Sequence, residues 1–439
     1  MHSTKLVKLW IPILFIALIS VYFLLIRRNI TTTITSPLEI ILLVGFVLAV
    51  AVALALVLIT LIGMALPNSR EASAEKLNIR LVNLAITAAL LVAFFAFSQL
   101  GAHTSPILGE DGKPIPNSIA TMERIELGGQ NQWIIVRGQD TTKPVLLLLS
   151  GGPGASESAR FIRFNHELEK HFVVVIWEQR GCAKSYPAHT PKADLTISQY
   201  VSDIVELTQY LQDRFDEEKI YLTGHSWGTI IGALAAEQYP ELFHAYIGTA
   251  QMVDVRKADQ IIYDAVLEQA ISAGDDAFVK TLKEQGEPPY FGNSPIQPYS
   301  TLFGREYSVF EYPNIKNEDF RRNGDALLMM LKQPEYGWLD RIYYLLGLMN
   351  TFNVVYPQLQ DLDLREEAVN FELPVYIILG RHDMNNPLPV PEEYFNLIEA
   401  PHKELFFFED SGHGMIWEEA DKFHSLLIDT IVPETYGNQ

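Results

Sequence analysis

Three long apolar runs occupy the first hundred residues of the chain. Residues 9–26, 40–66 and 81–100 contain no charged side chain. At about 1.5 Å per residue, each run is long enough as a helix to cross a hydrocarbon core about 30 Å thick. Charged residues flank the runs, which is typical of membrane-spanning helices and not of helices buried in a soluble domain. The pattern predicts a three-helix transmembrane segment over residues 1–100.

The charges between the runs predict how this segment is retained and oriented. Arg27 and Arg28 follow the first run directly, without a small-residue cleavage site, so we interpret the run as an anchor and not as a cleaved signal peptide. Short cytoplasmic loops carry an excess of Lys and Arg. The first loop holds only these two arginines, whereas the N-terminal flank and the second loop hold Lys5, Lys8, Arg70, Lys76 and Arg80. We expect an integral membrane protein of the cell membrane, with the large C-terminal part on the extracytoplasmic side.

The hydrophobic pattern changes after residue 100. Residues 101–118 are rich in Gly and Pro and lack periodicity, which predicts a linker. Short, continuous apolar runs then recur, and such runs are typical of parallel strands buried on both faces. Helical patterns such as residues 198–213 and 229–239 alternate with the runs, which favours an open α/β sheet. The runs lie at residues 145–151, 172–178, 220–226, 245–250, 374–380 and 403–410.

Two features complete the predicted architecture. Residues 122–127 and 132–138 have the pattern of an antiparallel hairpin that begins the sheet. Between residues 251 and 367 the strand–helix alternation stops and helical patterns remain. We therefore expect an α/β core formed by residues 119–250 and 368–439, with residues 251–367 inserted as a helical cap.

Charge and cysteine content narrow the function. The first hundred residues carry seven Lys and Arg against three Asp and Glu, whereas the whole chain has a net charge of −20, so the acidic excess lies in the remainder. An acidic domain repels phosphate backbones, which argues against a nucleic-acid partner. A single cysteine, Cys182, excludes an intrachain disulfide and a cysteine-cluster metal site. No metal-ligand spacing or phosphate loop is present, so we expect neither metal nor cofactor.

The segment GHSWG, residues 224–228, lies between an apolar strand pattern and a helical pattern. A nucleophile elbow needs this strand–turn–helix context, because its glycines let a strained turn expose the serine hydroxyl. Asp383 follows the run at 374–380, and His413 follows the run at 403–410. Serine, acid and histidine in this order predict a catalytic triad, in which the histidine takes the proton of Ser226 and the aspartate orients the histidine.

A further motif, SGGPG at residues 150–154, follows the first apolar run of the core. Such a turn can direct backbone N–H groups at a developing oxyanion. We assign this role to the N–H groups of Gly152 and of Trp227, the residue after the predicted nucleophile.

Together, SGGPG, WEQRGCAKS (177–185), GHSWG, GRHD (380–383) and SGHG (411–414) resemble the proline-iminopeptidase branch of the α/β-hydrolases. The resemblance implies an α/β-hydrolase fold and a serine peptidase that removes N-terminal residues. Ser150 stands where the family usually has His, and Glu178 stands where it usually has Asp. The family reads the free amine of its substrate with cap glutamates. The usual members of this branch are soluble enzymes, so the predicted transmembrane segment is an addition to the family's pattern.

We therefore expect a membrane-anchored serine hydrolase, an aminopeptidase that acts on short peptides through an acyl-enzyme. An esterase or lipase acting on membrane-derived esters is the first alternative, and a non-catalytic signalling relic is the second. The substrate amine needs a carboxylate, because a buried ammonium without a partner is unfavourable by several kcal/mol. Glu157, Glu306 and Glu311 are the candidates. His225, His382, Arg180 and Gln179 are interpreted as packing or loop-holding residues, and the oligomeric state is left open.

Overall fold

The computed structural model describes residues 2–30, 32–186 and 192–436, with side chains from residue 11 onward except at residues 32–34. Contacts divide the chain into two units. We call residues 1–103 and 330–341 the helical unit, and residues 104–329 and 342–439 the sheet unit.

Three helices form most of the helical unit: α1 (His2–Val21), α2 (Thr32–Ala65) and α3 (Arg70–Leu100). All three are long and apolar enough to cross a membrane. Both α2 and α3 extend beyond the apolar runs, and α3 already begins at Arg70, so most of the predicted second loop is helical. Large apolar side chains face outward, among them Ile41 at 69% and Ile62 at 63% exposure. This outward-facing apolar surface is what lipid-exposed helices require.

A buried ionic cluster closes one end of the helical unit. Glu39 of α2 is 0% exposed and accepts hydrogen bonds from Arg27 Nε at 3.0 Å and Tyr22 Oη at 3.1 Å. Its second oxygen accepts from Trp338 Nε1 at 2.9 Å and Arg341 at 3.1 Å. The last two residues belong to the stretch that the sequence pattern assigned to the cap. A segment from the last third of the chain therefore completes this unit.

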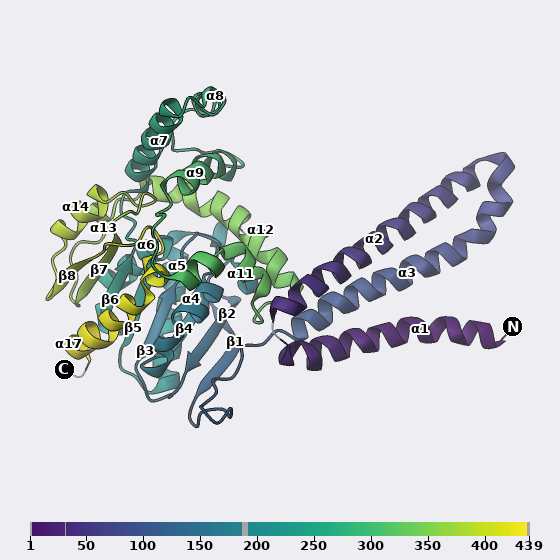
Figure 1. Cartoon of the computed structure of the whole chain (residues 1–439), viewed down its shortest axis with the longest axis horizontal. Helices are drawn as coiled ribbons and strands as arrows, with labels where there is room; N and C mark the ends of the chain where they lie inside the picture. Colours follow the sequence, from purple (N-terminus) through teal and green to yellow (C-terminus); the bar gives the residue numbers. More distant parts are fainter. Residues whose placement is uncertain (1, 31, 187–191, 437–439) are drawn as a thin grey trace. The chain divides into compact units, whose positions relative to one another are not determined.

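An eight-stranded sheet forms the centre of the sheet unit (Figure 1), in the order β1-β2-β4-β3-β5-β6-β7-β8. The first two strands form the predicted antiparallel hairpin, β2 also pairs antiparallel with β4, and the other neighbours are parallel. The strands are β1 (Ile119–Leu127), β2 (Gln130–Gly138), β3 (Val145–Leu149), β4 (Val173–Glu178), β5 (Ile220–His225), β6 (Phe243–Thr249), β7 (Val375–Gly380) and β8 (Lys403–Phe408).

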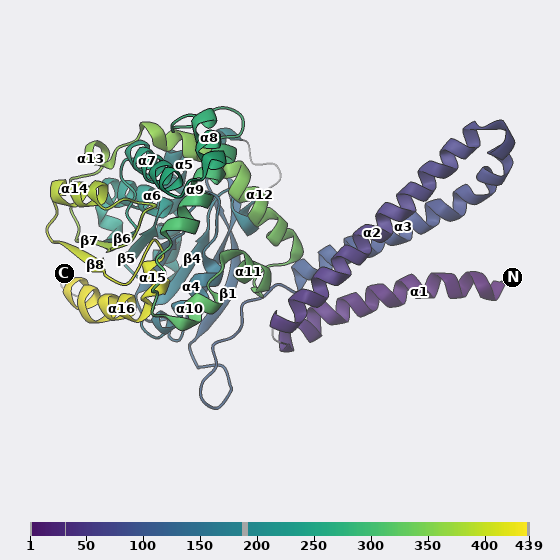
Figure 2. The same ribbon diagram turned by 45° about the horizontal axis from the view of Figure 1, so that its top comes forward.

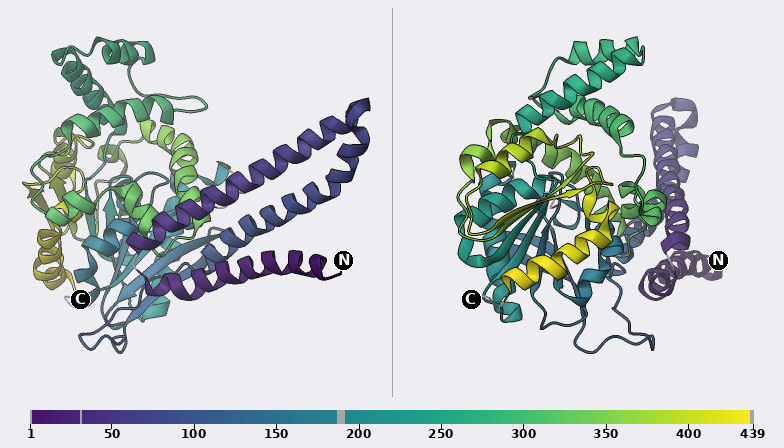
Figure 3. Two further views of the ribbon diagram at one scale, coloured as in Figure 1. Left: turned by 45° about the vertical axis from the view of Figure 1, so that its right-hand side comes forward. Right: turned by 60° about the vertical axis from the view of Figure 1, so that its left-hand side comes forward.

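Helices cover both faces of this sheet, as the side view in Figure 3 shows. In β3, Leu147 packs in one core with α5 (Ile197–Phe215), α6 (Trp227–Gln238) and α14 (Pro389–Leu397). The next residue, Leu148, packs in the other core with α4, α15 and α16. Alternate residues thus enter opposite cores, which explains why the run is continuously apolar. The helices in this second core are α4 (Ser158–Phe164), α15 (Met415–Glu418) and α16 (Ala420–Ser425), and Val432 of α17 (Val432–Thr435) packs against that core.

The chain between β6 and β7 is helical, as predicted (Figure 2). Helices α7, α8 and α9 remain within the sheet unit, whereas α11 and α12 each have one end in the helical unit. The seven helices are α7 (Val255–Ser272), α8 (Asp276–Gln285), α9 (Ile296–Phe310), α10 (Glu318–Asn323), α11 (Ala326–Lys332), α12 (Trp338–Val355) and α13 (Leu364–Glu367).

Candidate active site

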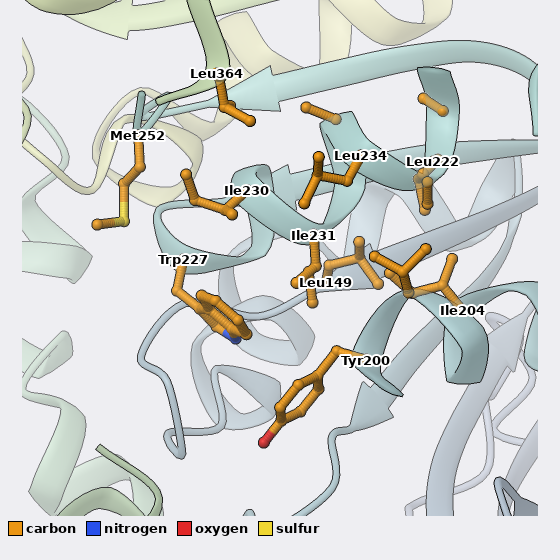
Figure 4. Packing of buried hydrophobic residues seen from close by; sticks show 14 of the residues in the cluster. Leu149, Tyr200, Ile204, Leu222, Trp227, Ile230, Ile231, Leu234, Met252 and Leu364 are labelled. Carbon is orange, nitrogen blue, oxygen red and sulfur yellow. The ribbon is translucent and has the colours of Figure 1, made fainter. Parts of the chain in front are cut away.

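Ser226 occupies a strained turn between β5 and α6. Its φ of 52° and ψ of −121° lie outside the regions that ordinary residues favour, and such strain persists only where the surroundings enforce it. A Cβ at Gly228 would overlap the carbonyl oxygen of Leu149, so only glycine allows α6 to approach β3 this closely. The helix packs through Ile230 and Ile231 on the sheet beneath (Figure 4). The turn is therefore fixed from below while the serine side chain remains 8% exposed.

His413 and Asp383 meet Ser226 at the carboxyl ends of three parallel strands. His413 Nε2 lies 3.1 Å from Ser226 Oγ. His413 Nδ1 lies 3.0 Å and 3.1 Å from the two carboxylate oxygens of Asp383. The backbone N–H groups of Asn385 and Asn386 donate to Asp383 at 2.9 Å and 3.0 Å, which orients a carboxylate that is only 4% exposed. Three residues far apart in sequence thus form one hydrogen-bonded chain.

The turn at residues 150–154 is tied to the helix that follows Ser226. Gln179 donates to the Ser150 carbonyl at 3.0 Å and accepts from Trp227 Nε1 at 2.9 Å. Because Trp227 is the first residue of α6, its backbone N–H has no acceptor within the helix. The indole is fully buried and meets Tyr200 edge-on at 5.4 Å (Figure 4). Gln179 therefore holds the two segments that carry the predicted oxyanion donors, Gly152 and Trp227.

Helix α12 covers this turn. A Cβ at Gly154 would lie 2.5 Å from the carbonyl oxygen of Gly347, so the two backbones approach within a distance that only glycine permits. Thr351, one turn later in α12, donates to the Gly181 carbonyl at 2.8 Å. The last part of α12 is thus packed directly on the segments that surround Ser226.

The profile of the family described as alpha/beta hydrolase fold matches residues 144–420. This chain belongs to the α/β-hydrolase family. It is 30% identical over 314 residues to the Bacillus subtilis (strain 168) protein named "Probable aminopeptidase YbaC", a match that covers 72% of this chain and 97% of that protein. It is 22% identical over 316 residues to a proline iminopeptidase of Lactobacillus delbrueckii subsp. bulgaricus, covering 72% of this chain and 98% of that protein.

A solved structure shares the fold of this α/β-hydrolase. The proline iminopeptidase of Mycobacterium smegmatis superposes with a TM-score of 0.51 at 17% identity, covering 73% of this chain and 100% of that chain. At this identity the likeness shows the fold alone. The names of the two curated relatives agree with the branch that the sequence motifs resemble.

The three candidate glutamates of this α/β-hydrolase have different surroundings. Glu306 of α9 is 3% exposed, and its Oε2 has no partner among the described residues. Burial and repulsion from the Asp383 carboxylate raise the pKa of Glu306 to about 8. Glu311, which directly follows α9, is exposed. Glu157 is already engaged: its carboxylate accepts from Gly151 N at 2.9 Å and lies 2.8 Å from His225 Nδ1.

Other residues predicted to be structural are held by clear contacts. His382 stacks on Tyr312 with ring centroids 4.2 Å apart, and Arg180 pairs with buried Asp203 at 2.8 Å. Cys182 is fully buried, and burial raises the pKa of its thiol well above the ordinary value, which disfavours the reactive thiolate.

Sequence reasoning missed several contacts around Ser226. His225 was interpreted as a packing residue, yet both of its ring nitrogens are engaged in polar contacts. Met252 Sδ lies 3.8 Å from Ser226 Oγ, and Tyr307 of α9 accepts a hydrogen bond from Asn385, two residues beyond Asp383. The local sequence carried no signal for these contacts, because each joins segments that follow different strands.

Among the described residues, one surface group has the composition of a metal site. His402, Glu404 and Glu434 bring possible ligand atoms within 4.8 Å of one another. Glu434 also accepts a hydrogen bond from Tyr376 at 2.7 Å. Exposed acidic groups of this kind are common without a metal, and the group takes no part in the arrangement around Ser226.

Proposed function

We propose that this α/β-hydrolase is a membrane-anchored serine hydrolase, an aminopeptidase that removes N-terminal residues from short peptides. The observation that carries the proposal is the chain of hydrogen bonds from Ser226 through His413 to Asp383. The names of the curated relatives, aminopeptidase and proline iminopeptidase, support the choice of substrate. The apolar helices would anchor the enzyme, and the Lys and Arg distribution of the sequence supports an extracytoplasmic site.

The proposed mechanism follows from the geometry. Ser226 Oγ attacks the scissile carbonyl while His413 Nε2 takes its proton, and Asp383 stabilises the imidazolium that forms. The N–H groups of Gly152 and Trp227 stabilise the oxyanion of the tetrahedral intermediate. His413 then gives its proton to the leaving amine, and a water molecule activated by His413 hydrolyses the acyl-enzyme. Every proton taken in one step is returned in the next.

Glu306 is the carboxylate that we propose to read the substrate's free amine. A buried carboxylate with an unpartnered oxygen is costly unless something compensates it, and a substrate ammonium would supply the missing partner. Its helix contacts the loop after Asp383 through Tyr307, and Asp383 is close enough to raise the pKa of Glu306, which supports a place for Glu306 in the substrate site. Exposed Glu311 remains solvated and gains little from such a partner.

The nucleophile is tested by Ser226→Ala in the full chain. Labelling by a fluorophosphonate, which reacts with activated serines, should disappear, and turnover should fall by about 10³-fold or more. The fold should remain intact, as judged by an unchanged thermal unfolding temperature. A variant that keeps its activity would contradict the assignment of Ser226.

The substrate class is tested with a peptide amide that has either a free or an acetylated N-terminus. The enzyme should prefer the free amine, and Glu306→Gln should abolish most of that preference, since an ion pair with a buried carboxylate contributes roughly 1–3 kcal/mol or a factor of about 10 to 100. Glu311→Gln is the matched control and should keep the preference. Equal rates on both peptides, together with faster turnover of esters, would instead favour the esterase alternative.

A further inference from the structure

His225, the residue before Ser226, has both ring nitrogens in polar contacts although it is only 2% exposed. Nδ1 lies 2.8 Å from Glu157 Oε1, and Nε2 lies 2.9 Å from the backbone carbonyl oxygen of His413. The ring also contacts Trp417 and the His413 ring, with centroids 4.8 Å and 5.0 Å away. One side chain therefore joins the nucleophile turn to two other loops of the site.

The partners dictate where the protons lie. A carbonyl oxygen can only accept, so Nε2 of His225 must carry a proton. Burial lowers the pKa of His225, but the charge and hydrogen bond of Glu157 outweigh it, so the net effect raises that pKa. Burial likewise raises the pKa of Glu157, but His225 outweighs it and the net effect lowers that pKa. Both shifts favour the charged forms, in which His225 donates from both nitrogens.

Each end of this pair reaches a part of the site that must be held accurately. Glu157 Oε2 accepts from Gly151 N at 2.9 Å, so the pair fixes the turn that presents Gly152. At the other end, the His225 N–H holds the backbone of His413, whose ring serves as the base. We propose that Glu157 and His225 form a positioning pair, which sets the distance between the oxyanion turn and His413 without touching substrate. The inference rests on the proposed serine-hydrolase function.

Loss of one proton would disable the pair. Neutral His225 has a single N–H and can serve either Glu157 or the His413 carbonyl, but not both. Because the pKa of His225 is raised, the pair is intact below that pKa and is lost as pH rises through it. The loss should reduce the rate of the chemical step and leave binding unchanged. Asp383 and His413 are the ionisable groups beside His225, and Arg160, Cys182, Tyr307 and Tyr344 are those near Glu157.

Glu157→Gln tests the inference because it can keep every hydrogen bond without the charges. The amide oxygen can accept from Gly151 N while the amide N–H donates to Nδ1 of a neutral His225, which still donates from Nε2 to His413. Activity at neutral pH should stay within about threefold of wild type, since the positions of the reacting groups are retained. The alkaline decline of the wild type should disappear, because His225 in this variant has no second proton to lose.

The readout is the rate of fluorophosphonate labelling of the full chain, followed upward from about pH 6, because a raised histidine pKa lies above the ordinary value of about 6.5. The probe carries no amine, so titration of a substrate or of an amine-reading carboxylate does not enter. His225→Phe removes both contacts and should slow labelling by about 10²-fold, as expected for a small misplacement of reacting groups, with KM for the peptide unchanged. Thermal unfolding monitors the fold of each variant.

Glu169→Gln is the matched control. Glu169 is also buried and pairs with Arg137 at 2.6 Å, but it has no contact with the site, so its pH profile should match the wild type. Absence of labelling in the wild type would reject the proposed function itself. Labelling of the wild type with the same alkaline decline in Glu157→Gln, or no alkaline decline in either protein, would overturn the positioning pair alone.

Discussion

Glu39 of the helical unit and Glu306 of the sheet unit are 0% and 3% exposed, yet their surroundings are opposite. Glu39 is satisfied on both oxygens by Arg27, Tyr22, Trp338 and Arg341. Glu306 leaves Oε2 unpartnered and lies close enough to Asp383 for repulsion. A fully paired buried carboxylate organises its own unit, whereas an unpaired one weakens the fold, which is why we proposed Glu306 as the group that reads the substrate amine. Degree of pairing, and not burial, separates the two roles.

The two units also place their apolar side chains differently. In the sheet unit, strands such as β3 and β7 are buried along their whole length, with polar groups concentrated at the carboxyl ends. In the helical unit, the apolar side chains face outward and the ionic cluster lies inside. The arrangement of polar and apolar side chains in the helical unit is thus the reverse of that along the strands of the sheet unit.

Removal of Glu39 should have the largest effect on stability. Glu39→Ala removes the carboxylate that pairs with both buried Arg27 and buried Arg341, which should lower the free energy of unfolding of the helical unit by about 3–5 kcal/mol. Thermal unfolding of the full chain in lipid nanodiscs measures the loss. If the variant unfolds at the same temperature as the wild type, the claim that the paired carboxylate of Glu39 stabilises the helical unit is wrong.

Removal of the Glu306 charge should act in the opposite direction. The pKa of Glu306 is raised from an ordinary 4.5 to about 8, so the unfolded chain ionises first and the protein loses stability as pH rises between these values. Glu306→Gln should therefore raise the unfolding temperature at pH 8 relative to wild type, by a stabilisation on the order of 1–3 kcal/mol after discounting the buried amide. At pH 4 the difference should vanish. A destabilised variant at pH 8 would mean that Glu306 has a partner after all.

Glu311 should give the smallest effect. Its side chain is exposed to solvent, so Glu311→Gln should change the free energy of unfolding by less than about 0.5 kcal/mol at both pH 4 and pH 8. The same unfolding experiment provides the measurement. A larger change would show that Glu311 interacts with Glu306, so that the effect of Glu306→Gln could not be assigned to Glu306 alone.

Much of the fold and of the candidate site could be predicted from the sequence, because burial of a strand determines the residue types within that strand. The runs that became β3, β4 and β7 are almost entirely apolar because each strand is buried on both faces, whereas β8, at the edge of the sheet, is only partly buried. Ser226, Asp383 and His413 each follow a strand of the sheet directly, so strand order alone brings them to one edge of the sheet. The pattern of local burial was enough to predict both.

Contacts between distant segments were not visible in the same way. Trp338 and Arg341 begin a helix that reads as part of the cap, and nothing near them in sequence indicates a glutamate about 300 positions earlier. Likewise, Glu157 was considered only as a substrate-binding residue and His225 only as a packing residue. Their pairing depends on a separation of 68 positions that no periodicity encodes.

The return of residues 330–341 to the helical unit has a consequence for proteolytic release of the chain that follows the linker. If only the linker joined the two units, one cut near the exposed turn at Gly112 would release the catalytic part. Because the C-terminal fragment still carries Trp338 and Arg341, it should stay bound to the N-terminal helices after such a cut. A specific protease site inserted at this turn would reveal co-purification of both fragments, and Glu39→Ala should turn the same cut into release. Residues 330–341 would then hold the two fragments together through contacts within the helical unit, which in the uncut chain act in addition to the peptide tether.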